Sequence, residues 1–271
     1  MEFAGKLIVV TGGGNGMGRE IALLLLERGA RVAAIDLSEA GLAETARLAG
    51  TGERLSTHVL NITERAAVEA APAAIEAAHG QPVDGLINVA GIIHRFAKLQ
   101  DLTLEEIERV IDVNYWGTVY MTKVFLPGLL ARPSAVLANF ASMGALIPFP
   151  GQGAYGSSKG AVRLFTETLL AELDGGPVKV SLVFPGAIGT NITGNSGVTT
   201  VGGPAQDEAS ASAMKPMAPA EAGRIIVDGI QAGRFRILVG KDAKTFDRLA
   251  RLMPTRAITS IAKKVGPMLG L

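Results

Sequence analysis

The sequence of 271 residues contains no cysteine. Disulfide bonds, thiolate metal ligands and a cysteine nucleophile are therefore excluded. Histidine is scarce as well, because His58, His79 and His94 are the only three and they lie far apart in the sequence. Metal sites usually need several such ligands at short spacing. No metal site is predicted.

An excess of charge of one sign is also lacking, since 26 basic and 25 acidic side chains leave a formal net charge of +1. We therefore expect no nucleic-acid partner. No apolar run approaches the roughly 18 residues that span a bilayer. The first such run, 7–10, is too short for a signal peptide, so we expect a cytoplasmic protein.

Short apolar runs alternate with helical patterns along most of the chain. The expected strands are 7–10, 32–35, 55–60, 83–88, 135–140, 178–184 and 235–239, and the expected helices are 17–29, 39–49, 63–79, 103–131, 154–173 and 219–232. Continuously apolar strands suit a parallel sheet that is covered on both faces. The pattern predicts an α/β fold with a single Rossmann-type doubly wound parallel sheet of about seven strands, flanked by helices.

We expect residues 1–240 to form one dinucleotide-binding catalytic domain, in which segment 186–218 is a lid over the substrate. The tail, 241–271, is basic and amphipathic. Its apolar face is predicted to contain Phe246, Leu249, Leu252 and Met253. Such a helix can lie on an anionic membrane, cover the mouth of the active site or pack on a neighbouring subunit. Packing within an assembly is favoured over the membrane.

A glycine-rich loop follows the first strand, where Thr11 to Gly18 reads TGGGNGMG and leads directly into a helix. Missing side chains let the backbone approach a pyrophosphate, and the helix N-terminus supplies free N–H groups. A glycine cluster alone is also compatible with a simple flexible turn. Asp36 closes the next strand, where a carboxylate can accept hydrogen bonds from ribose hydroxyls. This context favours a dinucleotide site.

Tyr155 and Lys159 are four residues apart on one expected helix and share a face. The pKa of a free tyrosine is near 10, and a neighbouring ammonium lowers it by stabilising the phenolate. The alternative is a surface pair that only supports the helix. Ser142 follows a strand at the edge where doubly wound sheets bind ligands, so its hydroxyl either holds a substrate oxygen or caps a turn.

Asn114 interrupts an apolar stripe that extends from Leu104 to Phe125 in the expected helix 103–131. A buried amide needs hydrogen-bond partners. Asn114 is therefore either a structural hydrogen-bonding residue or part of a site.

Residues 156–160 read GSSKG and match the G-x-S-x-G pattern of a hydrolase nucleophile elbow. An elbow needs a strand immediately before the serine and a histidine after it. Neither condition is met, because all three histidines precede Ser158. The hydrolase interpretation is excluded.

These motifs together resemble those of the short-chain dehydrogenase/reductase family. The glycine loop matches TGxxxGxG, and residues 88–91 read NVAG, which is similar to the family's NNAG. Tyr155 and Lys159 match YxxxK, thirteen residues after Ser142, and residues 185–190 resemble PGxxxT. The motifs follow the family's order from residue 11 to residue 190.

The resemblance implies an NAD-dependent oxidoreductase that interconverts a secondary alcohol and a ketone. Tyr155 would be the general acid/base, Ser142 would position the substrate oxygen, Lys159 would bind the nicotinamide ribose, and Asn114 would relay protons through water. The implied cofactor contacts are Gly12, Asn15, Gly16, Met17, Gly18, Asp36, Asn61, Ile62, Asn88, Ala90, Gly91, Tyr155, Lys159, Pro185, Gly186, Ile188 and Thr190. Asn61 departs from the Asp that the family usually places against the adenine.

NAD is expected rather than NADP, since a 2′-phosphate would lie against the carboxylate of Asp36. Asn15 and Leu37 occupy the positions where NADP-binding relatives usually carry a basic residue, and Arg19 is expected to point elsewhere. The expected substrate is a lipophilic small-molecule alcohol or ketone. Two alternatives remain, an NADP-dependent carbonyl reductase and a non-catalytic dinucleotide-bound sensor or scaffold. The resemblance also implies a homotetramer or homodimer.

Overall fold

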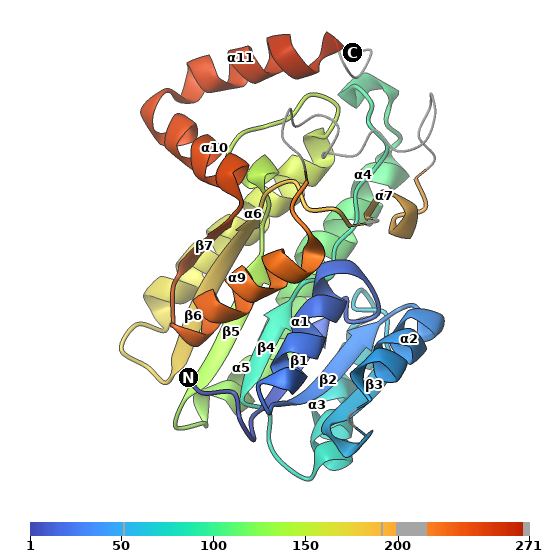
Figure 1. Cartoon of the computed structure of the whole chain (residues 1–271). Coiled ribbons are helices and arrows are strands. Elements are labelled where there is room, and N and C mark those ends of the chain that lie inside the picture. Colours follow the sequence, from blue (N-terminus) through green and yellow to red (C-terminus); the bar gives the residue numbers. More distant parts are fainter. Residues whose placement is uncertain (51, 191, 199–215, 268–271) are drawn as a thin grey trace.

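The computed structural model describes residues 1–50, 52–190, 192–198 and 216–267. In this part of the chain, seven strands form one sheet in the order β3-β2-β1-β4-β5-β6-β7, and every pairing is parallel (Figure 1). The strands are β1 Leu7–Thr11, β2 Arg31–Asp36, β3 Leu55–Val59, β4 Gly85–Asn88, β5 Ala135–Phe140, β6 Val178–Pro185 and β7 Arg236–Val239. The expected doubly wound sheet is confirmed.

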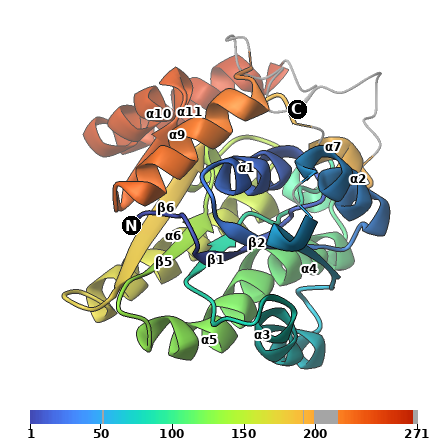
Figure 2. The ribbon, with the colours of Figure 1, turned by 60° about the horizontal axis from the view of Figure 1, so that its bottom comes forward.

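Helices cover both faces of the sheet. The main helices are α1 Gly16–Glu27, α2 Glu39–Ala49, α3 Arg65–His79, α4 Leu104–Ile111, α5 Gly117–Leu130, α6 Gly153–Glu172, α7 Ile192–Asn195, α9 Pro219–Gln231, α10 Lys241–Leu252 and α11 Pro254–Val265. Figure 2 shows α1 and α9 on one side of the sheet and α3, α5 and α6 on the other. Successive strand residues point to opposite faces. Ile8 and Val10 accordingly pack with the α1 and α9 layer, whereas Leu7 and Val9 pack with α3 and α5.

The strand order reverses between β1 and β4, which are neighbours although two strands separate them in the chain. Open α/β sheets bind ligands in the crevice at such a point, beyond the carboxyl ends of the strands. The glycine-rich loop leaves β1 and the segment 89–91 leaves β4 at this crevice. The topology therefore brings together two motifs that are 70 residues or more apart in the sequence.

The prediction of a single helix over 103–131 is wrong. A π-helical turn, Asp112–Trp116, separates α4 from α5. A π turn inserts one extra residue and frequently marks a functional site. Asn114 lies inside it and is fully buried, whereas Leu104, at the start of the expected apolar stripe, is exposed.

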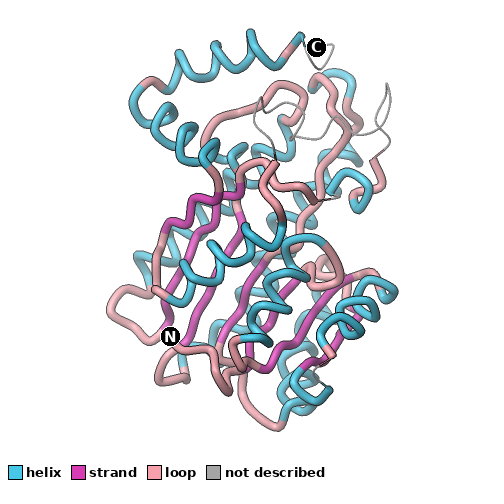
Figure 3. The backbone as a smooth tube through the Cα atoms, in the orientation of Figure 1, coloured by secondary structure: helices cyan, strands magenta, loops and turns pink. Residues whose placement is uncertain are grey.

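The tail also differs from the expectation of one amphipathic helix. It folds into two helices, because the backbone leaves the helical conformation at Met253 and Pro254 starts α11 (Figure 3). Phe246 and Leu249 pack against the buried Ile147, as expected of an inward face. Leu252 and Met253 are instead exposed, so their assignment to that face is wrong. Of the expected lid, 191 and 199–215 lie outside the described residues.

Candidate active site

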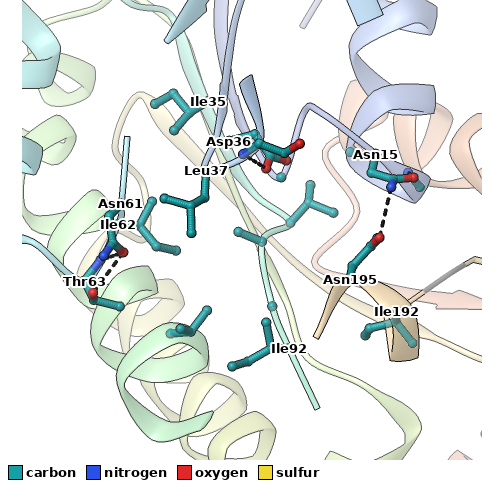
Figure 4. Close-up of a pocket in the computed structure, with 18 of the residues that line it drawn as sticks. Asn15, Ile35, Asp36, Leu37, Asn61, Ile62, Thr63, Ile92, Ile192 and Asn195 are labelled. Atoms are coloured by element: carbon teal, nitrogen blue, oxygen red, sulfur yellow. Dashed lines mark hydrogen bonds between the residues drawn. The ribbon is translucent and has the colours of Figure 1, made fainter. Parts of the chain in front are cut away.

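A cavity of about 800 Å³ follows the carboxyl edge of the sheet. Asp36 and Asn61 lie at one side of it, and Ile192 and Asn195 of α7 lie at the other (Figure 4). The predicted cofactor residues that line this cavity are Gly12, Asn15, Gly16, Met17, Gly18, Asp36, Asn61, Ile62, Ala90, Gly91 and Thr190. Most of the predicted cofactor set is thus brought together in one place.

A second cavity of about 60 Å³ adjoins the first. Its lining includes Ser142, Tyr155, Lys159, Pro185, Gly186 and Ile188. The two cavities share five wall residues, which are Met17, Val89, Gly91, Thr190 and Ile192. A ligand that extends from Asp36 past Gly91 therefore ends beside the side chains of Tyr155 and Ser142.

The glycine-rich loop is shaped by close backbone contacts. Gly12 has φ +71°, and a Cβ there would lie 3.1 Å from the backbone of Ala90. A Cβ on Gly18 would lie 2.1 Å from the carbonyl oxygen of Gly12. Larger residues at these positions would displace the loop from the cavity. The loop therefore presents backbone, rather than side chains, to the cavity, which is what a pyrophosphate requires.

The carboxylate of Asp36 holds the loop against the start of α2. It accepts hydrogen bonds from the backbone N–H of Gly14 at 2.9 Å and of Ser38 at 2.9 Å. Two carboxylate oxygens offer about four acceptor sites in total. The carboxylate thus keeps acceptor capacity for the hydroxyls of a ribose.

Arg19 points away from the cavity, as expected. Its guanidinium donates to the carbonyl oxygens of Gly14 and Gly41 and to Thr45 Oγ1. Among the described residues that line the larger cavity, the only basic one is Arg109, which donates to the carbonyl oxygen of Ser196 at 3.1 Å.

Asn61 uses its amide within its own turn. Oδ1 accepts from the backbone N–H and the hydroxyl of Thr63, and Nδ2 donates to Glu64 Oε1 at 3.1 Å. The side chain shapes the turn that leads to α3. It lines the cavity from this fixed position.

Tyr155 and Lys159 both lie buried on α6, one helical turn apart. Lys159 Nζ donates to the carbonyl oxygen of Phe140, at the end of β5, at 3.0 Å. Tyr155 lies in an apolar cluster with Ile93 and Val110, against which Ile192 also packs. A surface ion-pairing role for these two residues is thereby excluded, since neither is exposed.

Ser142 fits both interpretations of its hydroxyl. Oγ accepts from the backbone N–H of Gly144 at 3.1 Å and so caps the turn Met143–Ala145. The same side chain lines the small cavity together with Tyr155. The cap uses one lone pair, which leaves the hydroxyl proton and a second lone pair for a ligand.

Asn114 connects the two sides of the site. Oδ1 accepts from Ile92 N–H at 2.8 Å, and Nδ2 donates to the Ile92 carbonyl and to Ser158 Oγ, each at 2.9 Å. A Cβ on Gly91 would lie 2.9 Å from Lys159 Nζ and 3.1 Å from Asn114 Oδ1. Asn114 thus fixes the loop after β4 to α6, in close proximity to Lys159. The Asn114–Ser158 contact was not predicted from the sequence.

Asn88 lies behind the cavity wall rather than on it. Its amide donates to Asn139 Oδ1 at 2.9 Å and to Thr122 Oγ1 at 3.2 Å, and the residue is buried. These contacts connect β4 to β5 and α5. Asn88 therefore positions the neighbouring Ala90 and Gly91, which do line the cavity.

Asp242, in the tail, was missed by the sequence analysis. Its buried carboxylate accepts from the backbone N–H of Ala187 at 2.6 Å, and a Cβ on Gly186 would lie 2.2 Å from Oδ1. It therefore holds the loop after β6, part of the wall of the small cavity. The signal available in the sequence was Gly240 directly after the last strand, with Asp242 two residues further on.

Two polar atoms near Tyr155 are buried without a hydrogen-bond partner, His94 Nε2 and Gln152 Oε1. His94 Nδ1 lies 2.6 Å from the carbonyl oxygen of Arg95, so Nδ1 carries the proton and Nε2 is an acceptor. Burial lowers the pKa of His94 below its usual value, which favours the neutral ring. Gln152 Nε2 donates to the carbonyl of His94 at 3.1 Å. Both unpaired atoms are therefore acceptors.

The fold and these two cavities define a class of protein, the dinucleotide-binding oxidoreductases built on a doubly wound sheet. The model of the short chain dehydrogenase family matches residues 6–199, and the chain belongs to this family. The chain is 40% identical over 258 residues to the putative oxidoreductase SadH of Mycobacterium tuberculosis, covering 93% of this chain and 92% of the relative. It is 32% identical to 1-deoxy-11-beta-hydroxypentalenate dehydrogenase of Streptomyces avermitilis, covering 90% and 88%.

Solved structures agree in fold. A short-chain dehydrogenase/reductase from Burkholderia phymatum in complex with NAD matches with a TM-score of 0.82 and 28% identity, covering 92% of this chain and 94% of that one. A short-chain dehydrogenase from Burkholderia cenocepacia in complex with NADP matches with a TM-score of 0.79 and 25% identity, covering 96% and 99%. This chain is therefore an oxidoreductase of the family that acts on CH–OH groups.

Proposed function

We propose that this protein is an NAD-dependent dehydrogenase that interconverts a secondary alcohol and a ketone of a lipophilic small molecule. The observation that carries the proposal is the junction of the two cavities, one lined by Asp36 and the glycine loop and the other by Ser142 and Tyr155. A cavity of about 800 Å³ with a backbone cradle fits a dinucleotide. The nicotinamide, when bound, supplies the hydride acceptor or donor.

The remaining chemistry belongs to the side chains. In the oxidising direction, the substrate hydroxyl is held by Ser142 Oγ and Tyr155 Oη. Tyr155 Oη accepts the proton of this hydroxyl while a hydride leaves the carbon that bears the hydroxyl and passes to the nicotinamide, so that the alcohol becomes a ketone. Lys159, one turn away on α6, stabilises the phenolate form of Tyr155 and binds the ribose on the nicotinamide side. The proton then returns to solvent through water held by the remaining lone pair of Asn114 Oδ1.

Preference for NAD is supported by charge. Asp36 lines the larger cavity, and its carboxylate would repel the 2′-phosphate of NADP. Arg19 is bound to backbone carbonyls, and Arg109 is bound to Ser196, so neither is placed to compensate. Leu37 and Ser38, which follow Asp36, carry no charge.

A lipophilic substrate is supported by the surroundings of Tyr155. Ile93 and Val110 are buried beside it, and Ile92, Phe96, Ile192 and Val198 pack against this cluster. Clefts for small molecules are mostly apolar and carry a few placed polar groups. The hydroxyls of Ser142 and Tyr155 are such groups on this side.

A homo-oligomer is supported by exposed apolar residues on α5 and α6. Leu130, Leu164 and Leu170 are exposed there, together with Trp116 at the end of the π turn. Contiguous exposed apolar patches mark interaction surfaces, and these side chains are the candidates to contribute to one. Light scattering should give the mass of a dimer or tetramer, and Leu164→Lys should reduce it.

The function is tested by supplying NAD or NADP separately to the protein with a panel of aliphatic, cyclic and aryl secondary alcohols. Formation of reduced nicotinamide is followed by absorbance. We expect turnover with NAD, lost in Tyr155→Phe and retained in Tyr120→Phe, which removes a hydroxyl outside both cavities. Dinucleotide binding without turnover on any substrate would favour a sensor or scaffold. Turnover with NADP alone would favour a carbonyl reductase.

A further inference from the structure

The basic side chains of α10 lie along one exposed side of the helix. Lys241, Lys244, Arg248 and Arg251 are all exposed, and their spacing of three, four and three residues places them along one stripe. Leu252, next in the chain, falls on the edge of the same face and is 78% exposed. α11 adds the exposed Arg256, Lys263 and Lys264. The described tail thus exposes seven basic side chains.

The two acidic residues of the tail are both turned inward. Asp242 is buried under the loop after β6. Asp247 is buried and accepts from Arg236 at 2.6 Å, and Arg251 also reaches it at 3.2 Å. No carboxylate of the described residues forms an ion pair with Lys244, Arg248 or Arg256. The outward face is therefore uniformly positive.

An apolar corner lies between these cations. The chain turns from α10 to α11 at Met253, which is 42% exposed, and Ile258, 43% exposed, follows one turn into α11. Arg251 precedes this corner and Arg256 lies between Met253 and Ile258. Figure 1 shows the turn between the two helices at the outer side of the molecule, away from the sheet.

The opposite side of the same two helices is firmly packed. Phe246 contacts Phe149 edge to face with ring centroids 5.7 Å apart, and Ala257 and Ile261 are buried against Ile147. This inner contact fixes the corner on the segment that follows Ser142. The outward face is consequently a platform held in place by the fold.

We propose that this outward face, residues 241–264 with the corner Leu252, Met253 and Ile258, binds the surface of an anionic lipid membrane. Phospholipid headgroups attract Lys and Arg, and the acyl boundary accepts apolar side chains. No helix of the described residues is long and apolar enough to cross a bilayer, so the contact is peripheral.

A second copy of the chain fits this face less well. A two-fold contact would bring the same basic residues of both copies together, and like charges across an interface are costly. Lysine is also depleted in protein interfaces. Nucleic acid would satisfy the cations and leave Leu252, Met253 and Ile258 in water.

The test is co-sedimentation of the full-length protein with vesicles of phosphatidylcholine alone and of phosphatidylcholine mixed with phosphatidylserine. Binding to the mixed vesicles only, weakening with salt, is expected. Each cation removed should weaken partitioning about fivefold, so Arg248→Gln with Arg256→Gln should weaken it by more than about tenfold. The matched control is Lys123→Gln with Lys179→Gln, which removes two exposed charges from α5 and β6.

Leu252→Ser with Met253→Ser tests the apolar corner, and should weaken binding to the mixed vesicles without changing thermal unfolding, because both side chains are exposed. The proposal is overturned if the wild type stays in solution with both vesicle types, or if the control pair weakens binding as much as the arginine pair. It is equally overturned if the wild-type protein forms an oligomer that does not sediment with either vesicle type and the serine variant lowers the mass of that oligomer. None of these readouts requires turnover, so the proposed function is tested separately.

Discussion

The two ends of the cleft are constructed on different principles. At the Asp36 end, the glycine-rich loop presents backbone to the cavity, and the carboxylate itself is fixed by two backbone N–H groups. At the Tyr155 end, residues from α6, from the ends of β4 and β5 and from the loop after β6 surround a small cavity, and an apolar cluster adjoins Tyr155. A cofactor shared by many enzymes needs only a common backbone shape, whereas a particular substrate needs particular side chains. The difference explains why motifs describe the first end almost completely, whereas at the second end they give Tyr155 and Lys159 and leave the substrate unspecified.

The largest expected effect lies at the Tyr155 end. Tyr155→Phe should lower kcat by about 10²–10⁴, the usual contribution of a general acid or base, while NAD binding at the Asp36 end stays unchanged. Stopped-flow or steady-state turnover, together with a fluorescence titration of NAD, measures the two ends separately. Equal loss of affinity and turnover would show that the ends are not independent. Near wild-type turnover with chemistry rate-limiting would remove Tyr155 from the mechanism.

Asp36→Asn is the corresponding change at the other end. Loss of hydrogen bonds from ribose to a charged acceptor, about 1.5–3 kcal/mol, should weaken NAD by about tenfold or more and bring NADP closer to it. Asp112→Asn is the matched control, because Asp112 lines the same cavity from the π turn rather than from β2. Calorimetric titration of both cofactors decides the matter. Tighter binding of NADP than of NAD by the wild type would contradict the cofactor assignment.

Asp242→Ala tests whether the tail is part of the Tyr155 end. The variant leaves the N–H of Ala187 buried without its acceptor, so the free energy of unfolding should fall by about 1–3 kcal/mol. The KM for NAD should rise, since the loop after β6 loses its support. Asp174→Ala, which removes an exposed carboxylate, should change neither quantity. An unchanged unfolding curve would mean that the loop holds its own conformation.

The smallest expected effect concerns pH. Burial, and secondarily the Arg31 guanidinium beside it, lowers the pKa of His79, and burial lowers the pKa of His58 and His94. The unfolded chain therefore binds protons more readily below its ordinary histidine pKa of about 6.5. The free energy of unfolding should be constant above that pH and fall as pH decreases through it.

His79→Gln should reduce that slope. Nδ1 of His79 accepts from Arg31, so the proton lies on Nε2, which faces Ser56. Glutamine can still donate to Ser56 but does not titrate. Urea unfolding near pH 7.5 and pH 5.5 measures the difference, and an equal slope in the variant would assign the proton uptake elsewhere.

The sheet was predictable because most of its strands are largely apolar runs, with the edge strand β3 (LSTHV) the exception, and because its helices follow an amphipathic pattern. The glycine loop, Asp36 and the Tyr155–Lys159 pair were predictable because local geometry demands those residue types at fixed spacing. The π turn was not, since one extra residue leaves the apolar pattern of 103–131 nearly unchanged. Asp242 escaped because its partners at 186 and 187 are more than fifty residues away. Leu252 was wrongly assigned to the inward face of the tail because the apolar periodicity of the sequence continues across the bend that Pro254 imposes.

The π turn at Asp112–Trp116 also limits which sequence lengths this region tolerates. It holds one residue more than a regular helix of the same rise, so deleting a single residue there is sterically feasible. Each residue advances an α-helix by about 100°. A deletion within α5 would rotate the rest of that helix by this angle and turn core residues such as Phe125 out of the core, whereas the π turn can lose its extra residue with α5 kept in place. A single-residue deletion across 112–116 should therefore disturb the core less than one within α5, and its main effect should be to displace the buried Asn114.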